Sequence, residues 1–154
     1  MAPKDAPRIT VDVDDDLAAL VDAADLARAA LLALESEMAG EGELTIVVTG
    51  DAEVAALNQR YLGHLGPTDV LSFPTLSQTP GFVTSPEMTG YLGDIVIACP
   101  YAARQAAALD RTLREELRLL VVHGVLHLLG YDHASAEEEA AMWARQRAIL
   151  ARLA

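Results

Sequence analysis

The sequence between residues 113 and 133 reads LREELRLLVVHGVLHLLGYDH. Apolar residues occupy most positions of this stretch, which predicts a helix over 113–129 that is buried on most sides. Thr112 and Glu115 have the spacing of a capping box and predict where this helix begins. Gly130 predicts where it ends, because glycine readily takes the left-handed conformation that follows a helix. We therefore expect this helix to lie at the centre of the fold.

Three of the four histidines of the chain lie in this stretch, at His123, His127 and His133. His123 and His127 are four residues apart, so they lie roughly 40° from each other on one face of a helix. A turn at Gly130 allows the returning chain to bring His133 over the same point. Neutral imidazoles at this spacing suit a divalent metal with an open coordination position. The stretch predicts a metal site at the end of the central helix, with Zn²⁺ as the expected ion and Ni²⁺ as an alternative.

A zinc ion with three histidine ligands keeps a fourth position for water and lowers the pKa of that water to about 7. The zinc-bound water is therefore the expected nucleophile or general base. A fourth protein ligand would instead make the site structural, and Asp132 and Cys99 are the candidates for it. Asp132 adjoins a ligand and is better placed to accept a hydrogen bond from an imidazole N–H. Cys99 is better interpreted as a small buried residue.

The histidine spacing is also that of the metzincin zinc proteases. Those proteases carry a glutamate general base at the second position, where this chain has Gly124. A peptidase would therefore need another base, such as Asp94 from a distant strand. Phosphodiester cleavage depends less on such a base, because a metal and nearby cations stabilise the phosphoryl group. Both reaction classes stay open at this point.

The length of 154 residues and the hydrophobic content of 52% predict one domain, residues 1–154, with a single core. No apolar run approaches the roughly 18 residues of a membrane span. The N-terminal residues lack the apolar segment of a signal peptide. The single cysteine excludes an internal disulfide and fits a reducing compartment. These features predict a cytoplasmic protein without a membrane partner.

The net charge of −12 argues at first against a nucleic-acid partner, because phosphate binding normally uses basic surface. The charge is unevenly distributed, however. Residues 1–53 hold 13 acidic and 3 basic residues, whereas residues 54–154 hold 10 acidic residues and 8 arginines. The acidity lies mostly away in sequence from the histidines, so a local basic groove stays compatible with the composition.

Hydrophobic periodicity predicts strands and helices around the central helix. The strands are expected over 9–13, 44–49, 70–73 and 92–97, and the helices over 17–38, 51–61, 101–109, 113–129 and 135–153. Residues 74–90 are rich in proline, glycine, serine and threonine and predict a long surface loop. The order of the elements predicts an α+β fold: a single domain with an approximately four-stranded mixed sheet packed with about five helices.

Aspartates provide the expected N-caps of the first two helices. Residues 14–16 are expected to cap the first helix, and Asp51 is expected to cap the second. The second helix is expected to turn the Tyr61 side chain inward. Asp69 and Asp94 are interpreted as residues that accept hydrogen bonds from backbone amides beside their strands. A site role for either aspartate is the alternative interpretation.

Four segments together resemble the YbeY-type rRNA maturation endoribonucleases. They are LN at 57–58, PTDVLSFP at 67–74, LGDIVI at 92–97 and HGVLHLLGYDH at 123–133. They follow the family order over about half the chain, and the last motif is highly specific. The resemblance implies the same α+β fold, with His123, His127 and His133 as zinc ligands.

The resemblance also implies a function: a zinc-dependent, single-strand-specific endoribonuclease. Such an enzyme would act in maturation of the 3′ end of the small-subunit rRNA and in ribosome quality control. The implied partners are ribosomal RNA and the small ribosomal subunit, while DNA is not an expected partner and the oligomeric state stays open. Two other functions stay open: a metallopeptidase, and a ribosome-associated binding module whose metal is structural.

One position departs from the family pattern. Members commonly carry an arginine in the loop before Pro-Thr-Asp, and this arginine is regarded as important for activity. Alignment on residues 57–58 and on Pro67 places Leu62 there. Arg60, two residues earlier, or another group is then expected to make the phosphate contact. Arg60 and Asp94 are accordingly the candidate catalytic side chains, and the protein base is not assigned.

Overall fold

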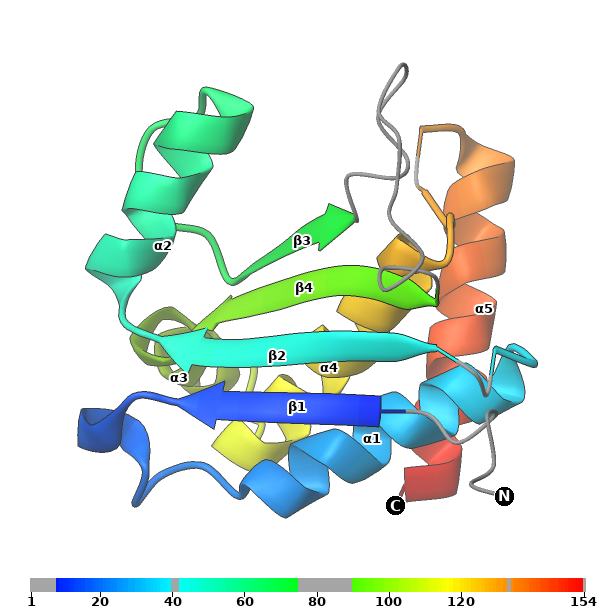
Figure 1. Cartoon of the computed structure of the whole chain (residues 1–154), viewed down its shortest axis with the longest axis horizontal. Coiled ribbons are helices and arrows are strands. Elements are labelled where there is room, and N and C mark those ends of the chain that lie inside the picture. The colour runs from blue at the N-terminus through cyan, green and yellow to red at the C-terminus, as the bar shows by residue number, and fades with distance from the viewer. Residues whose placement is uncertain (1–7, 40–41, 75–89, 133, 154) are drawn as a thin grey trace.

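The computed structural model describes residues 8–39, 42–74, 90–132 and 134–153. Within them, four strands form one sheet in the order β1-β2-β4-β3 (Figure 1). Three strands run parallel to one another: β1 (Arg8–Val13), β2 (Glu43–Thr49) and β4 (Tyr91–Ala98). The edge strand β3 (Val70–Pro74) runs antiparallel to β4. The predicted four-stranded mixed sheet is confirmed.

The described residues form five α-helices, as the sequence predicts. They are α1 (Ala23–Ser36), α2 (Asp51–Leu57), α3 (Cys99–Ala108), α4 (Leu113–Leu128) and α5 (Ala136–Leu153). A short 3-10 turn, η1 (Asp15–Leu17), precedes α1, and a π-helical segment, η2 (Asn58–Leu62), extends α2. Figure 1 shows α1 and α4 behind the sheet and α2 near the start of β3. The predicted α+β class is confirmed.

The central position of α4 follows from its apolar residues. Leu117, Val121 and Val125 recur at four-residue steps and are buried in the main core. Small residues on α1, among them Ala29 and Ala33, have no exposed surface and allow α1 to pack beside α4. Each large apolar side chain removed from water contributes roughly 1.5–3 kcal/mol. The prediction of a buried central helix is therefore confirmed.

The prediction for the first helix is wrong at its start. The helix was expected from residue 17, whereas α1 begins at Ala23 and only the short turn η1 covers residues 15–17. The physical reason is the cap: the Asp22 carboxylate accepts a hydrogen bond from the backbone N–H of Asp25 at 3.2 Å. Asp14 makes no such bond to the turn that it precedes, and its carboxylate instead accepts from the Thr49 hydroxyl at 2.7 Å.

The prediction that Asp51 caps the second helix is also wrong. Asp51 is the first residue of α2, and Gly50 occupies the N-cap position without a side-chain hydrogen bond. The Asp51 carboxylate instead accepts from the backbone N–H of Tyr101 at 3.0 Å and from Arg104 at 2.6 Å. Asp51 therefore satisfies the N-terminus of α3, a helix 50 residues away in sequence.

Two further predictions concern the surface loop at residues 74–90 and the lack of a membrane-spanning helix. Most of the expected surface loop, residues 75–89, lies outside them. Among the residues that the structure covers, no helix combines the length and the apolar character that crossing a membrane requires.

Candidate metal centre

Hydrogen bonds at both ends fix the extent of α4. At its start, the Thr112 hydroxyl accepts from the backbone N–H of Glu115 at 3.1 Å, and the Glu115 carboxylate accepts from the N–H of Thr112 at 2.9 Å. The predicted capping box is thus confirmed. The same backbone contact lowers the pKa of Glu115 below its ordinary value, because it favours the charged carboxylate.

A left-handed turn ends α4, again as predicted. Gly130 has a φ of 103°, and its N–H donates to the carbonyl of His127 at 3.0 Å. The N–H of Tyr131 donates to the carbonyl of Leu126 at 3.0 Å, which completes the hydrogen-bond pair of a Schellman motif. The Tyr131 hydroxyl donates to Glu37 on the segment after α1 at 2.5 Å, and this bond raises the pKa of Tyr131. These contacts hold the chain that follows α4 against the end of α1.

The last two turns of α4 carry the histidine pair. The ring centroids of His123 and His127 lie 4.6 Å apart with an interplanar angle of 74°. Both rings line a groove of about 370 Å³, whose other wall is formed by β3 and the segment before it: Leu62, Thr68, Asp69, Val70, Leu71, Ser72 and Pro74. The structure therefore brings two of the three predicted ligands together. The third, His133, lies outside the described residues.

Gln146 on α5 holds the His123 ring from behind. Its side-chain oxygen lies 3.1 Å from His123 Nδ1, and the residue is only 2% exposed. An amide oxygen only accepts hydrogen bonds, so in the neutral ring this contact places the proton on Nδ1 and the lone pair on Nε2. This is the tautomer that a metal ligand needs, and such outer partners typically orient ligating histidines. No short-range sequence pattern indicates this role for Gln146, which lies 23 residues from His123.

The opposite wall of the groove is tied to α4 through the half-buried Asp69 and Gln105 and the buried Glu116. Asp69 accepts from the N–H of Val70 at 2.8 Å and from the Gln105 side chain at 3.1 Å. The same Gln105 nitrogen donates to Glu116 on α4 at 2.7 Å. Asp69 is therefore a turn and cap residue, as one of its two interpretations predicted. The network fixes the start of β3 relative to the histidines.

A sequence profile described as Endoribonuclease YbeY matches residues 10–154. The chain belongs to this family. A protein of that name from Roseiflexus castenholzii is 46% identical over 147 residues, which cover 94% of this chain and 92% of the relative. The corresponding protein of Chloroflexus aggregans is also 46% identical, over 94% of this chain and 95% of the relative. The predicted resemblance and the assignment as an RNA-cleaving hydrolase are confirmed, and the metallopeptidase and binding-module alternatives gain no support.

The fold itself has a solved counterpart. The solution structure of TM1509 from Thermotoga maritima matches with a TM-score of 0.62, covering 96% of this chain and 88% of that protein. The two sequences are 24% identical, so this likeness concerns the fold alone. It supports the α+β architecture that this YbeY-family chain adopts.

Gly124, at the position where the metzincin proteases carry their glutamate base, packs tightly against β4. A Cβ at Gly124 would lie 2.9 Å from one side-chain carbon of Ile95 on β4 and 3.1 Å from two others. A side chain fits there only if the Ile95 side chain or the sheet itself shifts. Gly124 therefore serves the close contact of α4 with β4. A glutamate at this position would point into the sheet rather than into the groove.

The candidate base Asp94 lies away from the histidines. Its neighbour Ile95 faces α4, so Asp94 points to the other face of the sheet. There it accepts a hydrogen bond from the Tyr91 hydroxyl, which also contacts the Thr45 hydroxyl at 3.0 Å. Burial and this carboxylate raise the pKa of Tyr91. Asp94 is not among the residues that line the groove.

The remaining candidates divide between core and surface. Cys99 is 1% exposed in the core and does not line the groove, and burial raises the pKa of its thiol. Asp132 is exposed, so its role as an imidazole partner stays a prediction. Leu62 lines the groove at the position of the family arginine, and the Arg60 guanidinium lies 5.3 Å from the centre of the Tyr61 ring.

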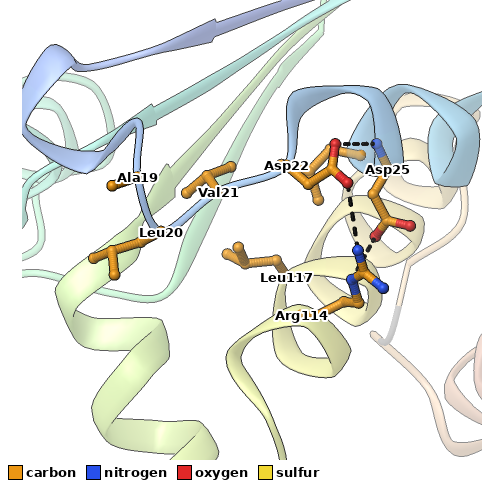
Figure 2. Close-up of a pocket in the computed structure, with 8 residues that line it drawn as sticks. Ala19, Leu20, Val21, Asp22, Asp25, Arg114 and Leu117 are labelled. Carbon is orange, nitrogen blue, oxygen red and sulfur yellow. Dashed lines mark hydrogen bonds and ion pairs between the residues drawn. The ribbon is translucent and has the colours of Figure 1, made fainter.

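A second hollow, of about 230 Å³, lies at the other end of α4 (Figure 2). Its polar wall consists of Asp22, Asp25 and Arg114, and its apolar wall includes Leu20 and Leu117. The charged groups contact one another: Arg114 lies 3.3 Å from Asp22 and 3.9 Å from Asp25. These ion pairs are consistent with a structural role for this end of the helix.

The residues of the groove fit a divalent transition metal. Two imidazoles stand on one helix face, and the contact of His123 Nδ1 with Gln146 leaves Nε2 of the neutral ring with a lone pair that can bind a metal. Within the described ranges no cluster of three or more histidine, cysteine, aspartate or glutamate side chains has metal-binding geometry. The predicted third ligand, His133, lies outside these ranges.

Proposed function

We propose that this protein is a zinc-dependent endoribonuclease that cleaves single-stranded RNA and matures the 3′ end of the small-subunit rRNA. The observation that carries the proposal is the groove between α4 and β3, where His123 and His127 stand together with the His123 ring oriented by Gln146. Membership of the YbeY family supplies the reaction class. Ribosomal RNA within the small subunit is the proposed partner, and the cytoplasm the proposed location.

The proposed ligands are His123, His127 and His133. A divalent ion held by three imidazoles supplies Lewis acidity, which polarises a phosphoryl oxygen and makes water more acidic. Zn²⁺ is the proposed ion, while Ni²⁺ also suits imidazole ligands. We further propose that residues 1–154 act as one catalytic domain, because the profile match extends from residue 10 to residue 154.

The polar side chains of the chain itself have separate tasks in this proposal. Gln146 keeps the proton on Nδ1 of His123, so that Nε2 faces the groove as a donor atom. The Thr68 and Ser72 side chains line the opposite wall, where hydroxyl groups suit phosphate and ribose oxygens. Asp69 and Gln105 position that wall through their mutual hydrogen bond.

The test is cleavage of a single-stranded RNA that carries the precursor 3′ end of the small-subunit rRNA, beside the same sequence in a duplex. We expect the purified protein to cut the single strand, and EDTA to abolish cutting. His127→Ala is expected to lower the rate by on the order of a thousandfold, because a bound metal contributes several kcal/mol to such reactions.

His64 offers a matched control, because it is the one histidine outside the motif and lies on an exposed loop. His64→Ala is expected to keep full activity and metal content. Cleavage that survives both EDTA and His127→Ala would contradict the proposal. Elemental analysis of the purified protein, with and without His127→Ala, identifies the ion that the histidines hold.

A further inference from the structure

An exposed aromatic side chain with two ordered neighbours lies beside the groove. Tyr61 is 58% exposed, although the helical pattern predicted it to face inward. The Phe73 ring meets it edge to face, with centroids 5.5 Å apart and an interplanar angle of 68°. The Arg60 guanidinium lies over the same ring at 5.3 Å. We call these three residues the Tyr61 platform.

A π-helical turn explains why Tyr61 faces outward. The segment η2 has a wider turn than an α-helix, so residues after its start are rotated relative to the pattern of α2. The loop that follows is held in place by Asn58, whose buried side chain donates to the carbonyl of Gly66 at 3.0 Å. The exposed ring is thus built on a fixed segment, and such π-helical turns often occur at functional sites.

The platform adjoins the histidine groove through the chain neighbours of two of its residues. Leu62, the residue after Tyr61, lines the groove together with His123 and His127. Ser72, the residue before Phe73, lines it as well. Because β3 is the edge strand of the sheet, a ligand chain can pass from the groove over that edge to the platform.

We propose that Tyr61, flanked by Arg60, is a stacking surface for an unpaired base of the RNA whose backbone lies in the groove. This proposal rests on the proposed function and names how the same site selects a single strand. An aromatic face with an adjacent guanidinium is the usual surface on which proteins stack unpaired bases. A base inside a duplex is stacked on its own neighbours and cannot reach such a surface.

The charge of the chain favours stacking as a source of affinity. A net charge of −12 leaves little general attraction for phosphates, so contacts to the bases must contribute more than in a basic RNA-binding protein. Among the arginines that the structure pairs with carboxylates are Arg104, Arg114, Arg118 and Arg145. The exposed Arg60 is placed over an aromatic ring instead.

A second tyrosine–arginine pair provides a matched comparison. The Arg104 guanidinium lies 5.6 Å from the centre of the Tyr101 ring, much as Arg60 lies over Tyr61. Arg104 is also bound to Asp51 at 2.6 Å, and Tyr101 is half-buried against the α2 side of the sheet. This second pair has the same chemistry, but no chain neighbour of Tyr101 or Arg104 lines the histidine groove, whereas Leu62 beside Tyr61 does.

The experiment measures the affinity of the full chain for a fluorescently labelled, unpaired oligonucleotide in the His127→Ala background, which removes cleavage. Tyr61→Leu is expected to weaken binding about tenfold, as loss of one stacked base typically does. Tyr61→Phe is expected to bind like the parent. Arg60→Gln is expected to weaken binding about threefold, and Tyr101→Leu to leave it unchanged.

An oligonucleotide with the same backbone but abasic positions separates stacking from phosphate contacts. The parent and the Tyr61 variants should bind it equally, because no base is present to stack. The proposal would be overturned if Tyr61→Leu and its parent bound the normal oligonucleotide with equal affinity. It would also be overturned if Tyr61→Leu lost as much affinity for the abasic strand as for the normal one, or if the parent bound neither strand.

The two proposals fail in different ways. Absence of RNA cleavage by the unmodified protein would contradict the proposed function, whereas the affinities of the Tyr61 variants test the platform without cleavage. Thermal melts check that each variant is folded. If Tyr61→Leu fails to fold, unchanged binding by the exposed Arg60→Gln variant overturns the proposal, and the expected loss supports it.

Discussion

The two halves of α4 use their polar residues for different purposes. In the first half, Arg114 pairs with Asp22, the N-cap of α1, and Arg118 pairs with Asp25 of α1. In the second half, the polar residues are His123 and His127, which line a groove instead. The Gln146 amide holds the His123 ring, and Thr68, Asp69 and Ser72 are among the residues on the opposite wall of the groove.

The difference shows how one helix can both stabilise a fold and present a reactive surface. The charges of Arg114 and Arg118 are paired within the protein, so they hold α1 and α4 together. A neutral amide at the second half orients an imidazole without giving it a positive charge. An imidazole that stays neutral keeps the lone pair that a metal requires.

The largest expected effect comes from breaking the ion pair of Arg118. This residue donates to both oxygens of Asp25, at 2.7 and 2.8 Å, and the Asp25 side chain is 8% exposed. Arg118→Met leaves that carboxylate with only the more distant Arg114, so we expect a loss of about 3 kcal/mol in the free energy of unfolding. Chemical denaturation measures it.

Arg114→Met is the matched control, because the Arg114 side chain is 58% exposed. Pairs at such exposed positions contribute less than about 1 kcal/mol. RNA cleavage by the folded fraction is expected to survive both substitutions. The distinction between the two halves of α4 would fail if both variants lost the same free energy of unfolding. It would also fail if the folded Arg118→Met protein lost its metal.

The second-largest effect is expected from substitution of Gln146. It should lower metal affinity without breaking the ion pairs at the first half of α4. Gln146→Leu fits the same buried space but provides no acceptor for His123 Nδ1. We expect metal affinity and RNA cleavage to fall by about 10- to 100-fold, as for other partners of metal-bound histidines. Gln146→Glu restores an acceptor and is expected to restore metal affinity. A Gln146→Leu protein with unchanged metal affinity would show that the ring needs no such support.

The sequence predicted those features that depend on short-range patterns. Period-two and period-3.6 hydrophobicity located the four strands and the buried helix, and the histidine pair follows from a spacing of four residues on one helix. The capping box of α4 was equally local, since Thr112 and Glu115 lie within one turn. Each of these features is decided by neighbours in the chain.

The features that the sequence did not predict depend on distant residues. Asp51 caps α3 rather than α2 because its partner Tyr101 lies 50 residues later. Gln146 supports His123 across 23 residues, and its only local signal was a lone amide on the buried face of α5. Tyr61 faces outward because a π-helical turn breaks the pattern of α2. Periodicity assumes an unbroken helix and says nothing about such partners.

Lowering the pH is expected to weaken the ion pair at the first half of α4. The resulting loss in the free energy of unfolding should be smaller than the loss caused by removing Arg118. The hydrogen bond from Arg118 holds the pKa of Asp25 below its ordinary value, whereas in the unfolded chain an aspartate titrates near about 3.9. Below that pH the unfolded chain binds more protons, so stability falls as the pH drops through the folded pKa and is fully present above the unfolded one.

Thermal melts between about pH 6 and about pH 2 test this sign, because the slope of stability with pH reports the difference in bound protons. Asp25→Asn removes the titrating group and is expected to give a lower but flatter curve than the unmodified protein. Parallel curves for the two proteins would mean that Asp25 does not contribute to the acid sensitivity.

The smallest expected effect is the loss of the helix cap. Thr112→Ala removes the hydroxyl that accepts from the N–H of Glu115, and such changes cost about 1 kcal/mol. In a chain of this size we expect the melting temperature to fall by roughly 2–4 °C. Because the cap lies at the opposite end of α4 from the histidines, metal content and the affinity for unpaired RNA are expected to stay unchanged. A change in either would mean that the two ends of the helix are coupled and that fraying at residue 112 reaches the groove.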